Sequence, residues 1–394
     1  MNAFDPGTSL LTDKGKLPTI ALVLGGVGLA ASAAGWALDA DRFYMSWLVA
    51  IVFWLTIALG SLFFVMLQHV TGAVWSVVVR RIAEAMSTVL PFLLVLFVPL
   101  IFGMHTLFHW THAEAVAQDP MLLWKSGYLD VTFALVRLVV YFAIWILLSW
   151  WLNRHSFAQD ADGDPMHTVS MRKISAGGMF LYAFSSTFFA FDWVMSLNPH
   201  WYSTIFGVYL FAAGFLATLA LMTIYTLRLS GMGDIHRFIT EDHLHDLGRL
   251  LFAFTVFWAY IAGSQYYLIW YANIPEETVW FLTRWEGSWK PFSIALIMLH
   301  FGVPFITLAF HRVKRTRVLL GGIAALLLVM HYADMYWLVM PTFFTSGVSV
   351  SWIDLAAWLG VGGVVMWRFS LRYTSRAIIP LHDPKRAESI AYHL

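Results

Sequence analysis

The chain has 394 residues, of which 60% are hydrophobic and only 12% are charged. Soluble domains carry about 25% charged residues, so this composition indicates an integral membrane protein. The formal net charge of +1 gives no reason to expect a nucleic-acid partner. The sequence contains no cysteine, which excludes disulfides, thiolate-bound zinc, iron–sulfur clusters and covalently attached c-type haem. We therefore expect any redox centre to belong to a partner.

Ten stretches are apolar over the length of about 20 residues that a helix needs to cross a membrane. In chain order they are 17–38, 45–67, 88–110, 128–152, 174–196, 201–228, 249–272, 289–311, 317–340 and 351–371. The connections are short, so we expect one all-α polytopic membrane domain over residues 1–394. The first stretch is longer than the roughly 7–15 apolar residues of a signal peptide, which predicts an uncleaved first span.

Basic residues are distributed unevenly between the two ends of these spans. The 24 Lys and Arg residues divide into 19 on the side of both termini, Arg137 inside a span, and four on the other side. Those four are Arg42, Lys125, Arg284 and Lys290. Basic loops are retained in the cytoplasm, so we expect both termini there. An even number of spans requires the same arrangement.

Three segments on the side of the termini are more polar. The stretch "QHVTGAVWSVVVRRIAEAM" (68–86) predicts an amphipathic helix on the membrane surface, with Trp75 at headgroup level and its charged residues in water. Those charged residues are Arg80, Arg81 and Glu84. The segments "AQDADGDP" (158–165) and "GDIHRFITEDHLHDLGR" (233–249) are interpreted as solvated loops rather than metal sites.

Ionisable residues inside spans are costly and are candidates for function. Arg137 and His331 each lie nine residues from the outer end of a span, about 13 Å deep at ~1.5 Å per residue. Asp334 lies one turn from His331 on the same face, which suggests a proton-exchanging pair. Arg137 cannot release its proton, so a carboxylate partner or a hydrated cavity is expected. A single group such as His300 or Asp192 can equally be a structural hydrogen-bonding group between helices.

Two further patterns lie near the outer ends of the spans. His105, His109 and His112 have the spacing i, i+4, i+7 and are interpreted as interfacial histidines rather than metal ligands. Paired axial histidines for haem are not found in the sequence pattern. In "AGSQYYLIWYANIPEETVWFLTRWEGSWKPF" (262–292), Pro275 is expected to stop a helix. Glu276 and Glu277 would follow in an outer loop that forms an interfacial cap, a proton exit or a docking surface.

Two of these motifs together resemble a known family. "FDWVMSLNPHWYSTIFGVYLFA" (191–212) and "GSQYYLIWYANIPEETVWF" (263–281) are similar to the F-type membrane subunits of alternative complex III, a bacterial quinol:cytochrome c oxidoreductase. These belong to the polysulfide-reductase-type (NrfD-like) membrane subunits. The resemblance extends over residues 17–380. It implies two four-helix bundles, 45–196 and 201–340, flanked by 17–38 and 351–371, in the bacterial inner membrane.

The resemblance also implies partners and cofactors. The partners are a homologous membrane subunit of the C type, an iron–sulfur subunit of the B type, a multihaem cytochrome subunit of the A type and small subunits. Haem and iron–sulfur clusters would be held by these partners and none by this chain, while quinol would bind here or, more favourably, in the homologous membrane subunit. The chain would then support quinol oxidation and proton transfer without a redox centre of its own. A secondary transporter and a purely structural membrane anchor are the alternatives.

The candidate residues for proton transfer or quinol binding fall into two groups. The first bundle is expected to gather His105, Asp130, Arg137 and Asp192 in one polar site that opens outward. The second is expected to form a chain of exchangeable groups from His300, His331 and Asp334 to Glu276 and Glu277.

Overall fold

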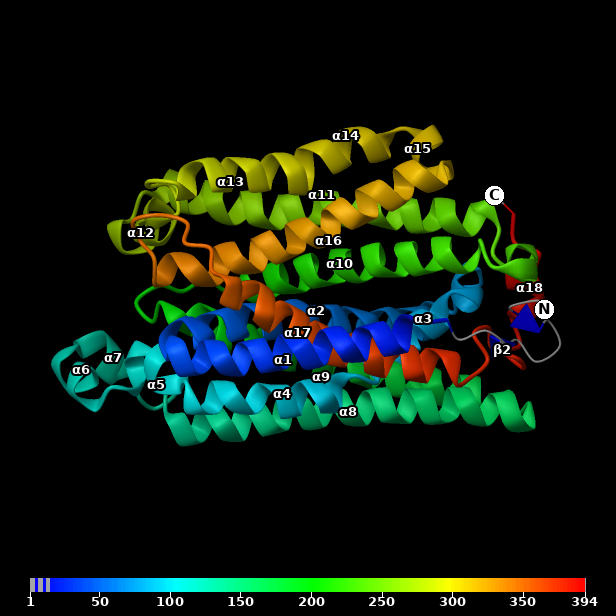
Figure 1. Ribbon diagram of the computed structural model, residues 1–394, viewed down its shortest axis with the longest axis horizontal. Coiled ribbons are helices and arrows are strands. Elements are labelled where there is room, and N and C mark those ends of the chain that lie inside the picture. Colours follow the sequence, from blue (N-terminus) through cyan, green and yellow to red (C-terminus); the bar gives the residue numbers. More distant parts are fainter. Residues whose placement is uncertain (1–3, 6–9, 12–14, 394) are drawn as a thin grey trace.

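The computed structural model describes residues 4–5, 10–11 and 15–393. These form an elongated array of helices, and a single pair of two-residue strands, β1 (Phe4–Asp5) and β2 (Leu10–Leu11), is also present. The long helices run along the longest axis of the molecule (Figure 1). One end of the array carries α12 and the other carries α18, and we call them the α12 end and the α18 end.

Within the described residues, eight helical segments are long and apolar enough to cross a membrane. They are α1 (Leu17–Leu38), α2 (Ala40–Thr71), α8 (Val131–Asp162), α9 (Met166–Trp193), α10 (Phe206–Leu229), α11 (Glu241–Ala272), α13 (Trp289–Ile297) with α14 (Val303–Ala309), and α16 (Arg317–Val339). A ninth candidate is a bent pair, α3 (Arg80–Ser87) and α4 (Leu90–Phe102), with a 40° angle between them. The protein is therefore a helical, multi-pass membrane protein.

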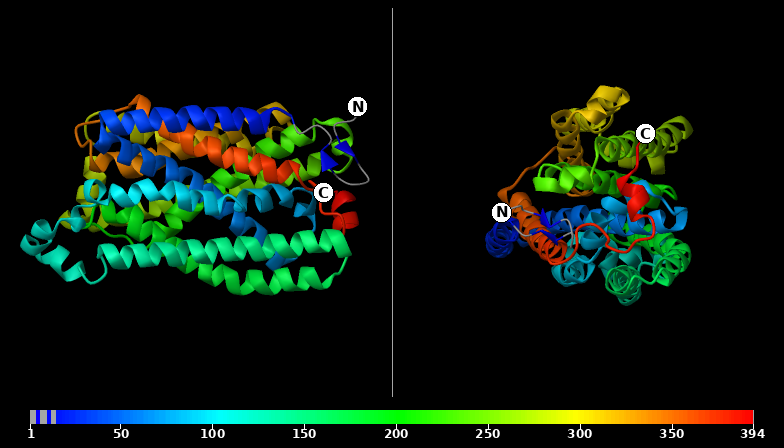
Figure 2. Two further views of the ribbon diagram at one scale, coloured as in Figure 1. Left: turned by 60° about the horizontal axis from the view of Figure 1, so that its bottom comes forward. Right: turned by 90° about the vertical axis from the view of Figure 1, so that its right-hand side faces the viewer.

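The remaining helices connect these segments or extend beyond them. Helix α17 (Trp352–Thr374) is as long as several of the spans but carries Asp354, Arg368 and Arg372. The short elements are η1 (Trp75–Val78), α5 (Met104–Leu107), η2 (His109–Thr111), α6 (Ala113–Gln118), α7 (Pro120–Lys125), η3 (Met195–Leu197), η4 (Gly233–Arg237), α12 (Pro275–Thr283), η5 (Met298–Gly302), α15 (His311–Arg315), η6 (Met340–Thr342) and α18 (Arg386–Ile390). Helices α6 and α7 project beyond the α12 end (Figures 1 and 2).

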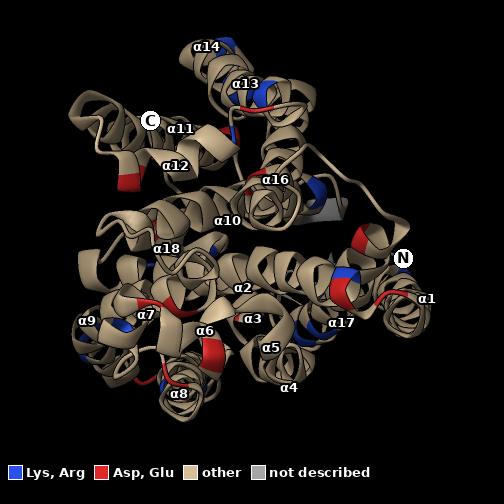
Figure 3. Cartoon of the chain, turned by 90° about the vertical axis from the view of Figure 1, so that its left-hand side faces the viewer, with Lys and Arg blue, Asp and Glu red and all other residues tan. Residues whose placement is uncertain are grey.

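Helix α2 forms the centre of the molecule, and nearly all of its side chains are buried. On one side it contacts α4, α8 and α9, and on the other it contacts α10 and α16. Helix α10 in turn contacts α11 and α16, while α14 lies against α11 (Figure 3). Helices α1 and α17 lie together along the edge of α2.

The contact between α1 and α17 depends on glycine. A Cβ atom on Gly28 would lie 2.3 Å from the backbone nitrogen of Gly360, and one on Gly363 would lie 2.1 Å from the Cα atom of Gly25. No ordinary side chain fits at such distances. The small residues therefore allow the two backbones to touch, as in tightly packed membrane helices.

Several helices extend beyond the predicted apolar stretches. Helix α8 continues to Asp162 instead of residue 152, and Gly163, with φ 73°, ends it. Helix α11 begins at Glu241 rather than at residue 249, so the His-rich segment is largely not the solvated loop that we predicted. His243 and His245 are buried within it. Nδ1 of His243 bonds to Thr240 of the same segment, and its Nε2 lies 3.0 Å from the carbonyl of Ser389, a distant partner that an apolar window cannot register.

The predicted stretch 88–110 is also interrupted. Helix α4 ends at Phe102, and α5 and η2 follow as separate short elements.

The prediction of an amphipathic surface helix over 68–86 is wrong. Helix α2 continues to Thr71, and Arg80, Arg81 and Glu84 are at most 4% exposed in the following helix. Glu84 accepts from Arg80 at 2.9 Å and from Arg81 at 2.8 Å. Asp383, from the C-terminal segment, accepts from Arg80, and Asp160 of α8 pairs with Arg81. These carboxylates neutralise the arginines and allow them to be buried.

Candidate functional site

The first polar cluster joins α8 to α9 near the α12 end. The guanidinium of Arg137 donates through Nε to Oδ2 of Asp192 at 2.8 Å and through Nη2 to Oδ1 at 3.1 Å. The hydroxyl of Tyr141 also donates to Asp192 at 2.8 Å. Arg137 further lies over the ring of Tyr128, 4.0 Å from its centroid, and over that of Phe133 at 4.2 Å. The predicted carboxylate partner of Arg137 is therefore confirmed.

Local folding explains this pairing. Helices α8 and α9 are antiparallel and joined by the short turn at residues 163–165. Arg137 and Asp192 lie almost equally far along the chain from that turn, so they reach the same height. Both oxygens of the carboxylate and two nitrogens of the guanidinium take part, which is the strong, directional form of such a pair.

His105 and Asp130 are not part of this cluster, contrary to our prediction. The Asp130 carboxylate accepts from the backbone N–H of Phe133 and so caps the start of α8. The ring of His105 stacks on that of His112 with centroids 3.7 Å apart. His105, His109 and His112 do not lie on one continuous helix, because α5 ends at Leu107. Aspartate is a preferred residue directly before the first turn of a helix, so the sequence could have indicated that Asp130 caps α8.

The second polar cluster surrounds Asp334 of α16. Its carboxylate accepts from the Tyr209 hydroxyl and, at 3.0 Å, from Nε1 of Trp258. Nδ1 of His300 lies 4.0 Å from Oδ2 of Asp334, and the His300 ring packs on Trp258 with centroids 4.2 Å apart. Asp334 and His300 are completely buried. Four helical segments thus meet at one carboxylate that has two neutral hydrogen-bond donors.

His300 lies in η5, a π-helical segment between α13 and α14. A π-turn is wider than an α-turn, shifts the side chains that follow it, and is frequent at functional sites. Pro304, just after this segment, has no N–H to continue the regular hydrogen-bond ladder. The sequence therefore contains a local reason for the irregularity that lies next to Asp334.

His331 does not pair with Asp334, although the two residues lie one turn apart. Nε2 of His331 is 2.9 Å from the hydroxyl of Thr56 on the central helix α2. The His331 ring packs on Phe53 with centroids 5.1 Å apart. His331 is completely buried, and its Nδ1 has no hydrogen-bond partner among the described residues. It therefore faces α2, whereas Asp334 faces α10 and α11.

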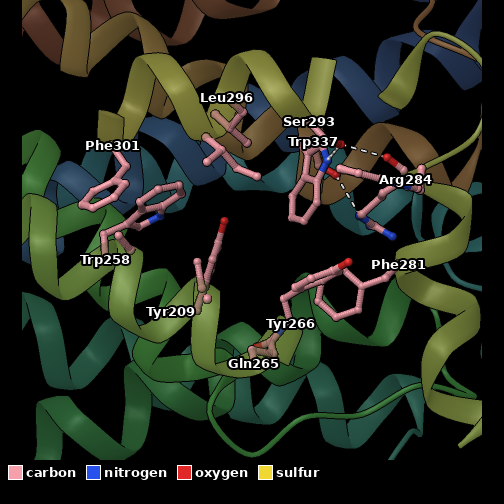
Figure 4. A pocket seen from close by; sticks show the side chains of 15 residues that line it. Tyr209, Trp258, Gln265, Tyr266, Phe281, Arg284, Ser293, Leu296, Phe301 and Trp337 are labelled. Atoms are coloured by element: carbon pink, nitrogen blue, oxygen red, sulfur yellow. Dashed lines mark hydrogen bonds between the residues drawn. The ribbon is translucent and has the colours of Figure 1, made fainter. Parts of the chain in front are cut away.

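A cavity of about 270 Å³ adjoins the Asp334 cluster (Figure 4). Tyr209 and Trp258, the two donors to Asp334, form part of its wall. The rest of the wall is mainly apolar and aromatic, and it includes Phe281 of α12. A pocket with a mostly apolar wall and few polar groups is typical of sites for small organic molecules.

The cavity opens sideways between α11 and α13. Three residues that line it are also exposed on the surface of the chain: Tyr266 is 44%, Trp285 41% and Ile297 46% exposed. These are large apolar or amphipathic side chains. The cavity is thus accessible from the face of a helix bundle that a membrane would surround.

Arg284 forms the polar edge of the cavity. It is only 2% exposed, and it donates to the backbone carbonyls of Trp280 at 2.8 Å, Leu338 at 2.8 Å and Trp337 at 3.2 Å. Its guanidinium carbon lies 3.4 Å from the centroid of the Trp280 ring. Burial lowers the pKa of Arg284. The three carbonyls and the aromatic face oppose this effect by stabilising the charged form.

Glu276 and Glu277 lie on α12 rather than in a loop. Pro275 is the first residue of that helix, and Asn273 ends α11 in the left-handed conformation with φ 49°. Glu276 is exposed and Glu277 is partly exposed. Neither lines the cavity, to which α12 contributes Phe281.

Our sequence reasoning missed three of the residues at this site. Tyr209, Trp258 and Arg284 are not among the predicted candidates, because aromatic residues are frequent in this chain and Arg284 lies between two expected spans. Tyr209 is part of the "GVYLFA" segment that carried the resemblance, and this was the available signal.

The motif around His200 has a separate role. The His200 ring contacts the carboxylate of Asp119, and this hydrogen bond lowers the pKa of Asp119. Lys125 donates to the carbonyl of Pro199 at 2.6 Å. These contacts fasten the projecting α6–α7 segment to the loop before α10.

Comparisons with known proteins add no assignment. The sequence matches no protein-family model, and a search of curated proteins found no significant relative.

Proposed function

We propose that the chain is a membrane subunit of a respiratory quinol:cytochrome c oxidoreductase of the alternative complex III type, and that its Asp334 cluster transfers protons. The sequence motifs 191–212 and 263–281 support the first part of the proposal. They converge in three dimensions, because Tyr209 belongs to one of them and Gln265, Tyr266 and Phe281, which line the cavity, belong to the other.

One observation supports proton transfer above all others. Asp334 is completely buried, and its hydrogen-bond donors, Tyr209 and Trp258, are neutral. The Arg137–Asp192 pair, in contrast, balances its charges internally. A buried carboxylate without a cation is costly when ionised, and protonation removes that cost. Asp334 is therefore suited to bind and release a proton.

The surroundings of Asp334 offer a route on both sides. The cavity reaches the donors of Asp334 from the α12 end, and a hydroxylated headgroup of a quinol would fit its volume and its lateral opening. His300, 4.0 Å from the carboxylate, and then His331 with Thr56 extend the series of polar groups toward the central helix. Quinol binding at this chain remains secondary in the proposal, because the homologous C-type membrane subunit is the favoured quinol site.

The finer architecture belongs to the same proposal. Counting the bent pair and α17 gives ten spans, in which α2, α4, α8 and α9 form one bundle and α10, α11, α13–α14 and α16 form the other. Helices α1 and α17 flank them. The α18 end would face the cytoplasm of a bacterium, and the multihaem, iron–sulfur, homologous membrane and small subunits would assemble around the chain. The contacts of α2 and α10 described above support this grouping.

The test is Asp334→Asn in the intact complex. The variant keeps the shape of the side chain and removes its titratable proton, so we expect assembly with unchanged haem spectra and a reduced proton-to-electron ratio or turnover in vesicles. Thr218→Val is the matched control, because Thr218 is equally buried on α10 and its hydroxyl donates only to backbone carbonyls.

Three results would contradict the proposal. Unaltered proton transfer and turnover in Asp334→Asn would leave the chain as a structural anchor. A control that is as impaired as the variant would indicate a packing defect. Purification of the chain as an independent solute carrier, without haem-containing subunits, would favour a secondary transporter.

A further inference from the structure

Three arginines form a row at the α18 end of α17. Arg368 and Arg372 lie on the last turns of the helix, and Arg376 follows its end. Arg368 and Arg372 lie four residues apart on one face of α17, and Arg376 follows at the same spacing just beyond the end of the helix. Arg368 and Arg372 are partly buried, while Arg376 is exposed.

Two arginines of the row lie against an aromatic side chain of α8, whereas the guanidinium carbon of Arg368 lies 5.4 Å from the centroid of the Phe92 ring on α4. The guanidinium carbons of Arg372 and Arg376 lie 4.4 Å and 5.1 Å from the centroid of the Phe157 ring, and that of Arg81 lies 4.6 Å from it. Three positive groups therefore surround one phenyl ring. Like charges so close together repel one another, most strongly where water is scarce.

The carboxylates in this region are already engaged. Glu84, Asp160 and Asp383 pair with Arg80 and Arg81. Within the described part of the chain, Arg368, Arg372 and Arg376 form no ion pair with a carboxylate. The Nε atoms of Arg368 and Arg372 are buried and have no hydrogen-bond partner in the described structure. The row thus has an excess of positive charge together with buried, unsatisfied donors.

We propose that this row binds the phosphate of an anionic phospholipid. Guanidinium groups bind phosphate through paired, charge-assisted hydrogen bonds, and the negative charge of the phosphate would reduce the repulsion. The row lies at the end of a helix of 23 residues, which is long enough to cross a membrane, and basic pockets between membrane helices bind such lipids. Leu371, which is 39% exposed, and Trp367 lie on the same segment and would contact the acyl chains. This inference is independent of the proposed function.

The test counts the lipids that the protein retains. The full chain is purified from nanodiscs containing equal amounts of phosphatidylglycerol and phosphatidylcholine, and bound lipid is measured by native mass spectrometry. We expect the unmodified chain to retain one phosphatidylglycerol more than Arg372→Gln/Arg376→Gln does. The control, Arg228→Gln/Arg312→Gln, removes two exposed arginines that lie on α10 and α15 at the same end. It should retain this lipid.

A second pair of measurements distinguishes the source of the phosphate and guards against a variant that does not fold. Arg372→Lys/Arg376→Lys keeps the charge but loses the paired hydrogen bonds, so its selectivity for phosphatidylglycerol should fall while the protein remains folded. Inorganic phosphate in lipid-free detergent should stabilise the unmodified chain less than phosphatidylglycerol does. Equal retention in all variants, equal loss in the control, or equal stabilisation by inorganic phosphate would overturn the proposal. Loss of a co-purifying acidic protein with retention of phosphatidylglycerol would overturn it as well.

Discussion

Two arginines near the α12 end are buried in different ways. Arg137 is neutralised by the carboxylate of Asp192, whereas Arg284 donates to three backbone carbonyls and stacks on Trp280. The ion pair of Arg137 and Asp192 has no net charge. The carbonyl groups around Arg284 stabilise its positive charge but do not neutralise it. Arg284 therefore gives the edge of the cavity a positive potential that would attract an oxygen of a bound molecule.

We expect substitutions of Arg137 and Asp192 to have strongly non-additive effects on the free energy of unfolding. Arg137→Gln leaves the Asp192 carboxylate buried with only the Tyr141 hydroxyl, and we expect a loss of about 3–5 kcal/mol in stability, the usual effect of breaking a buried pair. Arg137→Gln/Asp192→Asn removes both charges and should recover most of this loss. Thermal or denaturant unfolding in detergent measures both effects. Additive losses in the double variant would show that the two groups do not interact.

At this scale the sequence predicted the burial of the charges inside the apolar stretches but not all of their partners, and it wrongly placed Arg80, Arg81 and Glu84 in water. The antiparallel connection between α8 and α9 is short, so the heights of Arg137 and Asp192 follow from counting residues. His331 and Asp334 were paired by their spacing, yet their side chains diverge toward Thr56 and Tyr209. Those partners lie more than 120 residues away, as the sequence separations of 275 and 125 record, and no local pattern contains them.

At the scale of elements, glycine determines how closely α1 approaches α17. Gly28 and Gly360 touch through their backbones, while Gly26 on the same helix has no atom of another element within 4 Å of its Cβ position. Two positions that are two residues apart on α1 thus differ in whether there is room for a side chain.

This difference predicts opposite effects of one substitution. Gly28→Ala should destabilise the protein by about 1–3 kcal/mol, because its methyl group meets the backbone of α17 and the helices must separate. Gly26→Ala serves as the control and should be neutral or stabilise by up to ~1 kcal/mol through better helix propensity. Unfolding midpoints of the two variants measure the contrast. Equal midpoints would mean that the two helices are not packed through Gly28.

The hydropathy of the sequence located the helices well, but it did not predict where they begin or stop on the side of the molecule that carries α18. The apolar core of each span is recorded in the local sequence, and those helices are present. Polar turns such as Glu241–Asp246 and the segment around Arg81 are also helical, because carboxylates and carbonyls from other segments satisfy them. An apolar window treats such turns as loops, since it sees their polarity and not their partners.

At the scale of the whole molecule, the two polar clusters occupy separate groups of helices on either side of α2. Arg137–Asp192 is internally balanced, and it joins two consecutive helices, α8 and α9. The Asp334 cluster has no such balance, brings together α10, α11, η5 and α16, and adjoins the cavity. The asymmetry suggests that one half of the molecule maintains structure while the other carries the exchangeable proton.

The direction of the proposed proton transfer depends on which end of the molecule faces the cytoplasm. The four basic residues of the α12 end are Arg42, Lys125, Arg284 and Lys290, and those counted on the other side lie near the α18 end wherever the structure describes them. Two of those four are almost fully buried: Arg42 is 4% exposed and pairs with Asp354, and Arg284 is 2% exposed. Arg80 and Arg81 on the other side are also buried, so the excess of accessible basic residues there is as large as in the sequence count and supports the prediction that the α18 end is cytoplasmic.

Cysteine labelling tests this orientation without interference, because the chain contains no cysteine. Glu276 at the α12 end and Glu388 at the α18 end are both exposed, whereas the neighbouring Ser389 is buried and would be a poor reporter. In spheroplasts, a membrane-impermeant thiol reagent should label Glu276→Cys and leave Glu388→Cys unlabelled. After permeabilisation, both variants should react, which controls for the accessibility of each site. Labelling of Glu388→Cys alone before permeabilisation would show that the orientation is the reverse of the predicted one. The cavity beside Asp334 would then open toward the cytoplasmic half of the membrane.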